Sequence, residues 1–216
     1  MNIKNEYTFE QFSTLPLVSS INKIVEEIRE PMEGNCLYQH HSNFKFHRDN
    51  KEALRQNIHT LCKQSKSILE IGFNAGHSAA LYTYANPEII IRSFDLCLHK
   101  YTKPCSELLA STLPDFKLIP GDSRETVGKY NEITKFDLIH IDGGHGYNAA
   151  KCDLYECKKF STKDTILIFD DAYHTFVERL LTEETSSSNR TGMIKEVNYN
   201  DYNLLPTKWH RVFKYE

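Results

Sequence analysis

Acidic side chains that could bind a metal ion occur at two places in this sequence, each directly after an apolar run. Asp142 follows the run at 136–141, and Asp170 and Asp171 follow the run at 165–169. If these runs are neighbouring parallel strands, their carboxyl ends meet at one edge of the sheet and the three carboxylates converge. Three converging carboxylates are unfavourable unless they are protonated or bind a cation, and oxygen ligands suit Mg²⁺, Mn²⁺ or Ca²⁺ better than zinc. The alternative is that one of them caps a helix and the others face solvent.

A histidine, His145, lies three residues after Asp142 in the same segment. Histidine has an ordinary pKa near 6.5, and a neighbouring cation would favour the neutral form of the imidazole, which can accept a proton. The alternative is a loop histidine between glycines. His174 could line the metal side as well.

A glycine-bracketed turn follows the first apolar run of the central segment. Gly72 and Gly76 enclose it, and small residues there let a ligand approach the backbone at a helix N-terminus. A dinucleotide-binding fingerprint starting at Gly72 would need glycines where this chain has Asn74 and His77, so a pyrophosphate-binding loop is disfavoured.

Two further carboxylates end the next two strand-like runs. Asp95 follows the run at 89–94 and could accept both hydroxyls of a ribose. Asp122 follows the run at 116–119 in a similar position. Together with the turn at 72–76, they predict one ligand-binding edge.

The elements that position these residues alternate between short apolar runs and helical stretches, which predicts a doubly wound α/β fold with a mostly parallel sheet. Two later runs, 193–199 and 209–215, predict an antiparallel hairpin at the sheet edge. The expected parallel strands are 67–71, 89–94, 116–119, 136–141 and 165–169, and the expected helices are 77–85, 103–112, 123–132, 147–160 and about 173–183.

The first third of the chain predicts helices and a loop. Ser20 is expected to cap a helix that ends at Pro31. A second helix is expected to begin at Asp49, with Glu52 as its capping-box partner. Between them lies an expected loop at 33–48 that contains His40, His41 and His47 and could contact the substrate. We expect a helical segment and substrate cap at 1–66 and the cofactor-binding unit at 67–216, within one domain overall.

Three motifs together resemble the cofactor-binding edge of the class I S-adenosylmethionine-dependent methyltransferases. The resemblance covers residues 67–216 and implies a Rossmann-like methyltransferase fold with a seven-stranded sheet. The sequence departs from many members at Asn74, where they carry glycine, although some small-molecule O-methyltransferases also lack that glycine. The motifs are Glu70-x-Gly72-x-x-x-Gly76, Asp95 and Gly121-Asp122-Ser123.

The resemblance implies a position for each part of S-adenosylmethionine. The turn at 72–76 would approach the methionine moiety, Asp95 the ribose, and Asp122 with Ser123 the adenine. The full set of expected cofactor contacts is Glu70, Gly72, Phe73, Asn74, Gly76, Ser78, Asp95, Asp122, Ser123 and Asp142.

The carboxylate segments resemble those of the metal-dependent O-methyltransferases of the catechol and macrolide-sugar type. Their ligand positions match Asp142, Asp170 and Asp171, and the position of the catechol-type general base matches His145. The resemblance implies transfer of a methyl group to a hydroxyl of a small molecule such as a sugar or natural product, assisted by Mg²⁺ or another divalent cation.

Composition excludes several other classes of protein. The net charge of −3 and pI of about 6.4 give no basic surface for nucleic acid. The start of the chain resembles no signal peptide and no apolar run is long enough to span a bilayer, so we expect a cytoplasmic protein with six reduced cysteines. A homo-oligomer is compatible with the sequence.

Two alternatives stay open at this point. One is a nicotinamide-dependent oxidoreductase, since Tyr147-x-x-x-Lys151 matches the catalytic pair of short-chain dehydrogenases. That pair follows the fourth strand here rather than the fifth, and the glycine fingerprint is missing. The other is a non-catalytic module that binds the cofactor without turnover.

Overall fold

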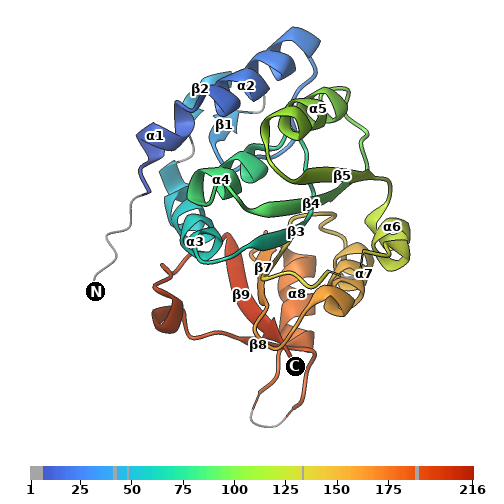
Figure 1. The fold of residues 1–216 in the computed structure, drawn as a ribbon. Coiled ribbons are helices and arrows are strands. Elements are labelled where there is room, and N and C mark those ends of the chain that lie inside the picture. The colour runs from blue at the N-terminus through green and yellow to red at the C-terminus, as the bar shows by residue number, and fades with distance from the viewer. Residues whose placement is uncertain (1–6, 41–42, 48, 133, 188–189) are drawn as a thin grey trace.

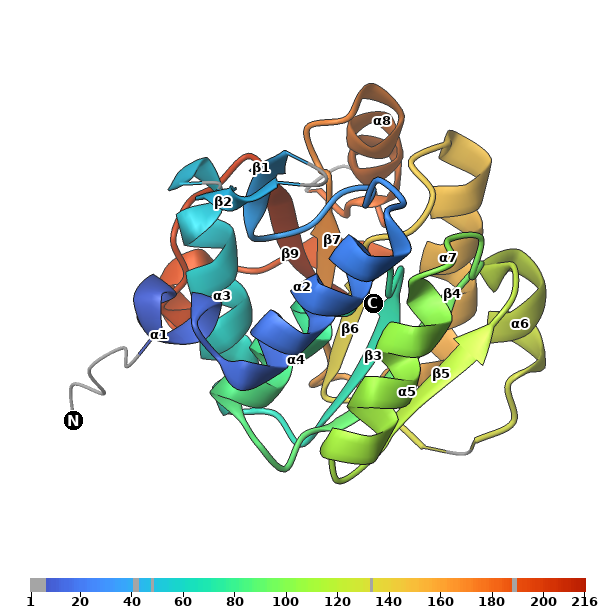
Figure 2. The same cartoon turned by 90° about the horizontal axis from the view of Figure 1, so that it is seen from above.

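A seven-stranded sheet lies between two layers of helices in the computed structural model, which describes residues 7–40, 43–47, 49–132, 134–187 and 190–216 (Figures 1 and 2). Five strands are parallel, and β9 runs antiparallel to both of its neighbours. The predicted fold class, with its antiparallel hairpin, is thereby confirmed. From one edge to the other, the strands are β5 (Phe116–Pro120), β4 (Ile90–Asp95), β3 (Ser67–Ile71), β6 (Leu138–Ile141), β7 (Ile166–Asp170), β9 (His210–Tyr215) and β8 (Ile194–Glu196).

The parallel strands are buried on both faces, which is why their sequences are almost continuously apolar. Ile68 and Leu138 face one helical layer, and Leu69 and Ile139 face the other. The first layer contains α3 (Glu52–Lys63), α4 (His77–Ala85) and α5 (Thr102–Thr112), and the second contains α6 (Ser123–Lys129), α7 (Tyr147–Cys157) and α8 (Thr175–Glu184).

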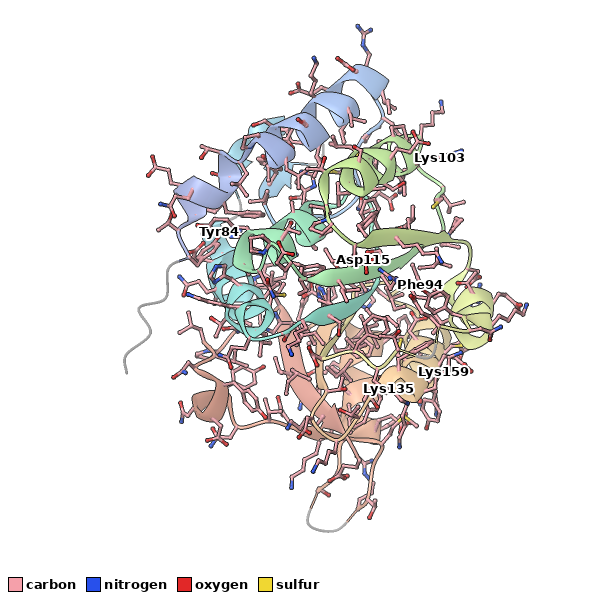
Figure 3. The ribbon with its side chains drawn as sticks, in the orientation of Figure 1. Tyr84, Phe94, Lys103, Asp115, Lys135 and Lys159 are labelled. Atoms are coloured by element: carbon pink, nitrogen blue, oxygen red, sulfur yellow. The ribbon has the colours of Figure 1, made fainter. Side chains whose placement is uncertain are left out.

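Two N-terminal helices, α1 (Phe9–Ser13) and α2 (Pro16–Ile28), lie over the first layer (Figure 2). Tyr84 of α4 points toward α1, where its ring centroid lies 5.8 Å from that of Phe12 (Figure 3). The prediction that Ser20 caps α2 is wrong. The helix begins one turn earlier at Pro16, whose fixed φ suits the first helical position.

The segment expected to be a loop contains a short antiparallel hairpin of β1 (Tyr38–His40) and β2 (Asn43–His47). His41 lies outside the described residues, as do the side chains of His40 and His47, and the hypothesis that this segment contacts the substrate stays a prediction. A 3-10 turn at Asp49–Lys51 precedes α3, so the α-helix begins at Glu52 rather than at Asp49.

The boundaries of the other elements differ from the predicted ones by a few residues at most. The helix expected at 147–160 ends at Cys157 and continues as a 3-10 turn, Lys158–Phe160, and another 3-10 turn occupies Tyr199–Tyr202. All six cysteines are unpaired. Within the described ranges, every helix is too short or too polar to cross a bilayer.

Candidate active site

The turn between β3 and α4 has a backbone conformation that few residue types other than glycine adopt readily. Gly72, Asn74 and Gly76 all have positive φ angles, of 97°, 55° and 88°. A Cβ atom on Gly72 would lie 2.0 Å from the backbone oxygen of Asp142, so this glycine lets β3 and the loop after β6 touch. The turn is thus fixed directly against the segment that carries the first candidate metal ligand.

Asp95 at the end of β4 holds this turn in place. One carboxylate oxygen accepts the Asn74 backbone N–H at 2.8 Å, and the other accepts the Cys97 N–H at 2.7 Å. Since a carboxylate offers about four acceptor positions, Asp95 can also accept hydroxyl groups from a ligand. It lines the cavity described next.

A cavity of about 330 Å³ lies at the carboxyl ends of the parallel strands. Its wall is formed by the turn after β3, the loops after β4 and β6, residues 33–35, Lys51 and Asp171. Leu96 and Leu98 line it with exposed fractions of 54% and 76%. Exposed leucines next to carboxylates suit a ligand with both apolar and polar parts.

The structure brings most of the predicted site residues to this cavity. Those that line it are Gly72, Phe73, Asn74, Ser78, Asp95, Ser123, Asp142, His145 and Asp171.

Four predicted residues do not line the cavity. Glu70 is fully buried and accepts hydrogen bonds from Tyr82 and Ser93, and burial raises its pKa to about 7. Asp122 caps α6 and pairs with Arg124 at 2.5 Å. Gly76 packs against the Phe73 ring, and Asp170 is buried.

The three candidate metal ligands divide between two groups that share Asp142. In one, donor atoms of Asp142, His145 and Asp171 lie within 4.8 Å of one another, and in the other the donors belong to His140, Asp142 and Asp170. Burial and the charges of Asp170 and Asp171 raise the pKa of Asp142 well above its ordinary value. Burial also raises the pKa of Asp170 to about 6. Ionisation of all of these carboxyl groups together is therefore disfavoured unless a positive charge lies near them.

His145 and Asp171, which both line the cavity, form a hydrogen-bonded pair. Nε2 of His145 lies 2.7 Å from Oδ2 of Asp171. This hydrogen bond raises the pKa of His145. Burial opposes ionisation of Asp171, but the hydrogen bond from His145 and its charge outweigh burial and lower the pKa of Asp171. Asp171 has a φ of 49°, an uncommon conformation for aspartate that directs its side chain here. The ring of His174 lies 5.4 Å from that of His145, between centroids.

Lys51 is a site residue that the sequence analysis missed. Its side chain is 7% exposed, lines the cavity and lies 4.8 Å from the centroid of the Trp209 ring. Its charge favours the ionised forms of Asp142 and Asp170, acting against burial. A single lysine before a helix carries no signal in the sequence, because only the packing of the 3-10 turn Asp49–Lys51 against the sheet edge brings it to the carboxylates.

Tyr147 and Lys151, the pair that could indicate a dehydrogenase, are not part of the site. Both are on α7, where Tyr147 donates a hydrogen bond to Glu183 and Lys151 pairs with Glu184 at 3.3 Å. Neither residue lines the cavity, so nothing in the geometry favours the oxidoreductase.

Solved structures of known proteins share this fold. TomG of Streptomyces achromogenes, an O-methyltransferase involved in tomaymycin synthesis that was solved with S-adenosylmethionine, is 15% identical with a TM-score of 0.60, and the match covers 94% of this chain and 92% of TomG. CalS11, a TDP-rhamnose 3′-O-methyltransferase of calicheamicin biosynthesis, is 17% identical with a TM-score of 0.58 and coverages of 93% and 95%. The methyltransferase PaMTH1 of Podospora anserina, solved with S-adenosylhomocysteine, is 14% identical with a TM-score of 0.61 and coverages of 96% and 93%. At these identities, the likeness establishes the fold.

The sequence itself matches one family model. A comparison with curated protein sequences finds no match, whereas residues 69–172 match the family model described as a methyltransferase domain. The matched segment runs from β3 to the loop after β7 and includes the turn after β3, Asp95 and all three candidate metal ligands. Residues 69–172 are thus similar to a methyltransferase domain, in agreement with the resemblance that the motifs of the sequence carry.

Proposed function

We propose that this protein transfers the methyl group of S-adenosylmethionine to a hydroxyl of a small molecule, with the assistance of a divalent cation. The observation that carries the proposal is the convergence of Asp142, Asp170, Asp171 and His145 next to the turn at Gly72. The cavity is large enough for a small ligand but its lining is formed by short loops, which suits a sugar or natural product rather than a macromolecule.

The residues around the cavity fit such a cation. Asp142 and Asp170 supply carboxylates whose ionisation burial disfavours, and Asp170 Oδ1 is a buried atom with no hydrogen-bond partner among the described residues. A bound cation would offset the negative charge and lower the pKa of a nearby substrate hydroxyl.

His145 would remove the proton of that hydroxyl. Because Nε2 is hydrogen-bonded to Asp171, the proton of the neutral imidazole lies on Nε2 and Nδ1 keeps its lone pair. As the C–S bond of the methyl donor breaks and the O–CH₃ bond forms, the hydroxyl proton passes to Nδ1, and Asp171 stabilises the resulting imidazolium. S-adenosylhomocysteine and the methyl ether are the products.

Calorimetry and turnover test the proposal together. The purified chain should release heat on binding S-adenosylhomocysteine, and should methylate at least one member of a panel of hydroxylated sugars and phenols. EDTA and Asp142→Asn should each abolish turnover, whereas Asp164→Asn, an exposed aspartate on the loop before β7, should leave it unchanged. Full turnover in EDTA would remove the cation from the proposal, and the absence of cofactor binding would overturn it.

A further inference from the structure

One face of the sheet carries a histidine beside the carboxylates. Residues two apart on a strand point to the same face, so His140 and Asp142 follow each other on the side of β6 that faces α3 and α4. Glu70 pairs with His140 in the register of β3 and β6. On the other side, His140 pairs with Ile168 of β7, and Asp170 comes two residues later on the same face.

His140 is held by a chain of buried hydrogen bonds. Its Nδ1 lies 2.6 Å from the Tyr82 hydroxyl, which donates to Glu70 at 2.7 Å, and Glu70 also accepts from Ser93. Because the single proton of the Tyr82 hydroxyl is used toward Glu70, the hydrogen bond between His140 and Tyr82 is donated by Nδ1–H. The other ring nitrogen, Nε2, is then unprotonated and carries a lone pair.

This lone pair accepts no hydrogen bond from the part of the chain that the structure describes. His140 is 1% exposed and Asp170 5% exposed, and neither His140 Nε2 nor Asp170 Oδ1 has a hydrogen-bond partner among the described residues. His140 and Asp170 belong to the group in which one donor atom of each residue, together with one of Asp142, lies within 4.8 Å of the others. A buried imidazole nitrogen thus lies close to two carboxylates, and the other imidazole nitrogen is linked to the carboxylate of Glu70 through Tyr82. Metal-binding histidines have this arrangement, in which the second ring nitrogen is hydrogen-bonded to a fixed acceptor.

We propose that His140 Nε2, Asp142 and Asp170 bind the cation, and that the site prefers a first-row transition ion such as Mn²⁺ or Co²⁺ to Mg²⁺. The inference rests on the cation assistance in the proposed function and changes its ligand set, since Asp171 belongs to His145 instead. Mg²⁺ is suited to carboxylate, carbonyl and water oxygens, whereas imidazole suits first-row transition ions, for which the affinity of a given nitrogen and oxygen site rises from Mn²⁺ through Co²⁺.

The probe is Mn²⁺ added to the purified full chain without cofactor or substrate. Electron spin-echo spectroscopy should show modulation from an imidazole nitrogen, and Mn²⁺ should bind at least about tenfold more tightly than Mg²⁺ in competition. His140→Gln should abolish the nitrogen modulation and weaken Mn²⁺ binding at least about tenfold. His145→Gln should retain the modulation, and so should His59→Gln, which replaces an equally buried histidine packed against Tyr7 and Tyr84.

The wild-type spectrum keeps the inference testable if His140→Gln fails to fold. The inference is overturned if the wild type shows no nitrogen modulation, if the modulation disappears in His145→Gln but not in His140→Gln, or if Mn²⁺ does not bind. Failure of the proposed function would look different: Mn²⁺ would bind through His140, but no acceptor would be methylated. Conversely, methyl transfer by an all-oxygen Mg²⁺ site would retain the function and overturn this ligand set.

Discussion

Substitution of Gly72 by alanine tests whether the close contact between β3 and the loop after β6 holds the site together. Gly72 has a φ of 97°, and an alanine Cβ would lie 2.0 Å from the Asp142 backbone oxygen and 2.7 Å from its carbonyl carbon. Both atoms belong to backbone that is tied down, because the Asp142 N–H donates to Ile71 O at 2.8 Å. Relief of the clash therefore requires one strand end to move.

The magnitude follows from two contributions. An alanine in a left-handed conformation is disfavoured by about 1–2 kcal/mol, and overpacking of a buried contact destabilises by about 1–3 kcal/mol. The sum is a decrease in the free energy of unfolding of about 2–5 kcal/mol. For a chain of 216 residues, this corresponds to a decrease in Tm of roughly 4–20 °C.

Urea and thermal unfolding of Gly72→Ala and Gly146→Ala measure this difference. Gly146 has a φ of −70° and a Cβ on it would meet nothing within 4 Å, so its replacement should change stability by less than about 1 kcal/mol. Because Asp142 moves with the contact, Gly72→Ala should also weaken binding of S-adenosylhomocysteine. The reasoning is refuted if both variants unfold within about 0.5 kcal/mol of the wild type.

Four other substitutions test separate features of the site and of the fold. Asp171→Asn should move the acidic limb of the plot of kcat/KM against pH to lower pH. His145 acts as a base only when it is deprotonated, and its hydrogen bond to Asp171 raises its pKa. An acidic limb at the same pH in the variant would contradict this role of Asp171. His145→Gln should lower kcat by about 10²–10⁴-fold, and equal rates in a single-turnover assay would exclude it as the base. Asp95→Ala should weaken S-adenosylhomocysteine binding roughly 10–100-fold in calorimetry, since the turn loses the acceptor of the Asn74 N–H; an unchanged Kd speaks against that. Burial lowers the pKa of His77 to about 4, so the unfolded chain binds a proton that the folded chain does not as pH falls below about 6.5. His77→Gln should therefore reduce the loss of stability between about pH 6 and 4.5 by up to about 1.4 kcal/mol per pH unit in urea titrations, and an unchanged slope would show that His77 is protonated in the fold.

The sheet and its functional edge could be predicted because local sequence determines them. Apolar runs buried on both faces are legible without tertiary information, and the range 67–71 coincides with β3. The carboxyl ends of parallel strands must meet, so the convergence of Asp142 with Asp170 and Asp171 followed from topology alone.

What the sequence could not supply was the orientation of individual side chains. Glu70 ends up in the core, bound to Tyr82, because strand alternation directs it toward α4 rather than toward the cavity. Asp122 is occupied by Arg124, only two residues away, a local competition that residue types do not decide. His140 was within reach of prediction, since it precedes Asp142 by two residues on a strand.

The position of β9 between β7 and β8 has a consequence for the folding of the chain during its translation. Asp170 pairs with His210, and the Ala172 N–H donates to Trp209 O at 3.1 Å. During translation, β7 emerges well before β9, so until residues 209–215 follow, β7 is the unpaired edge of a parallel sheet, and such edges can pair with strands of other chains. In the interval between the synthesis of these two strands, the edge of β7 is therefore open to pairing with another chain, and β9 closes it.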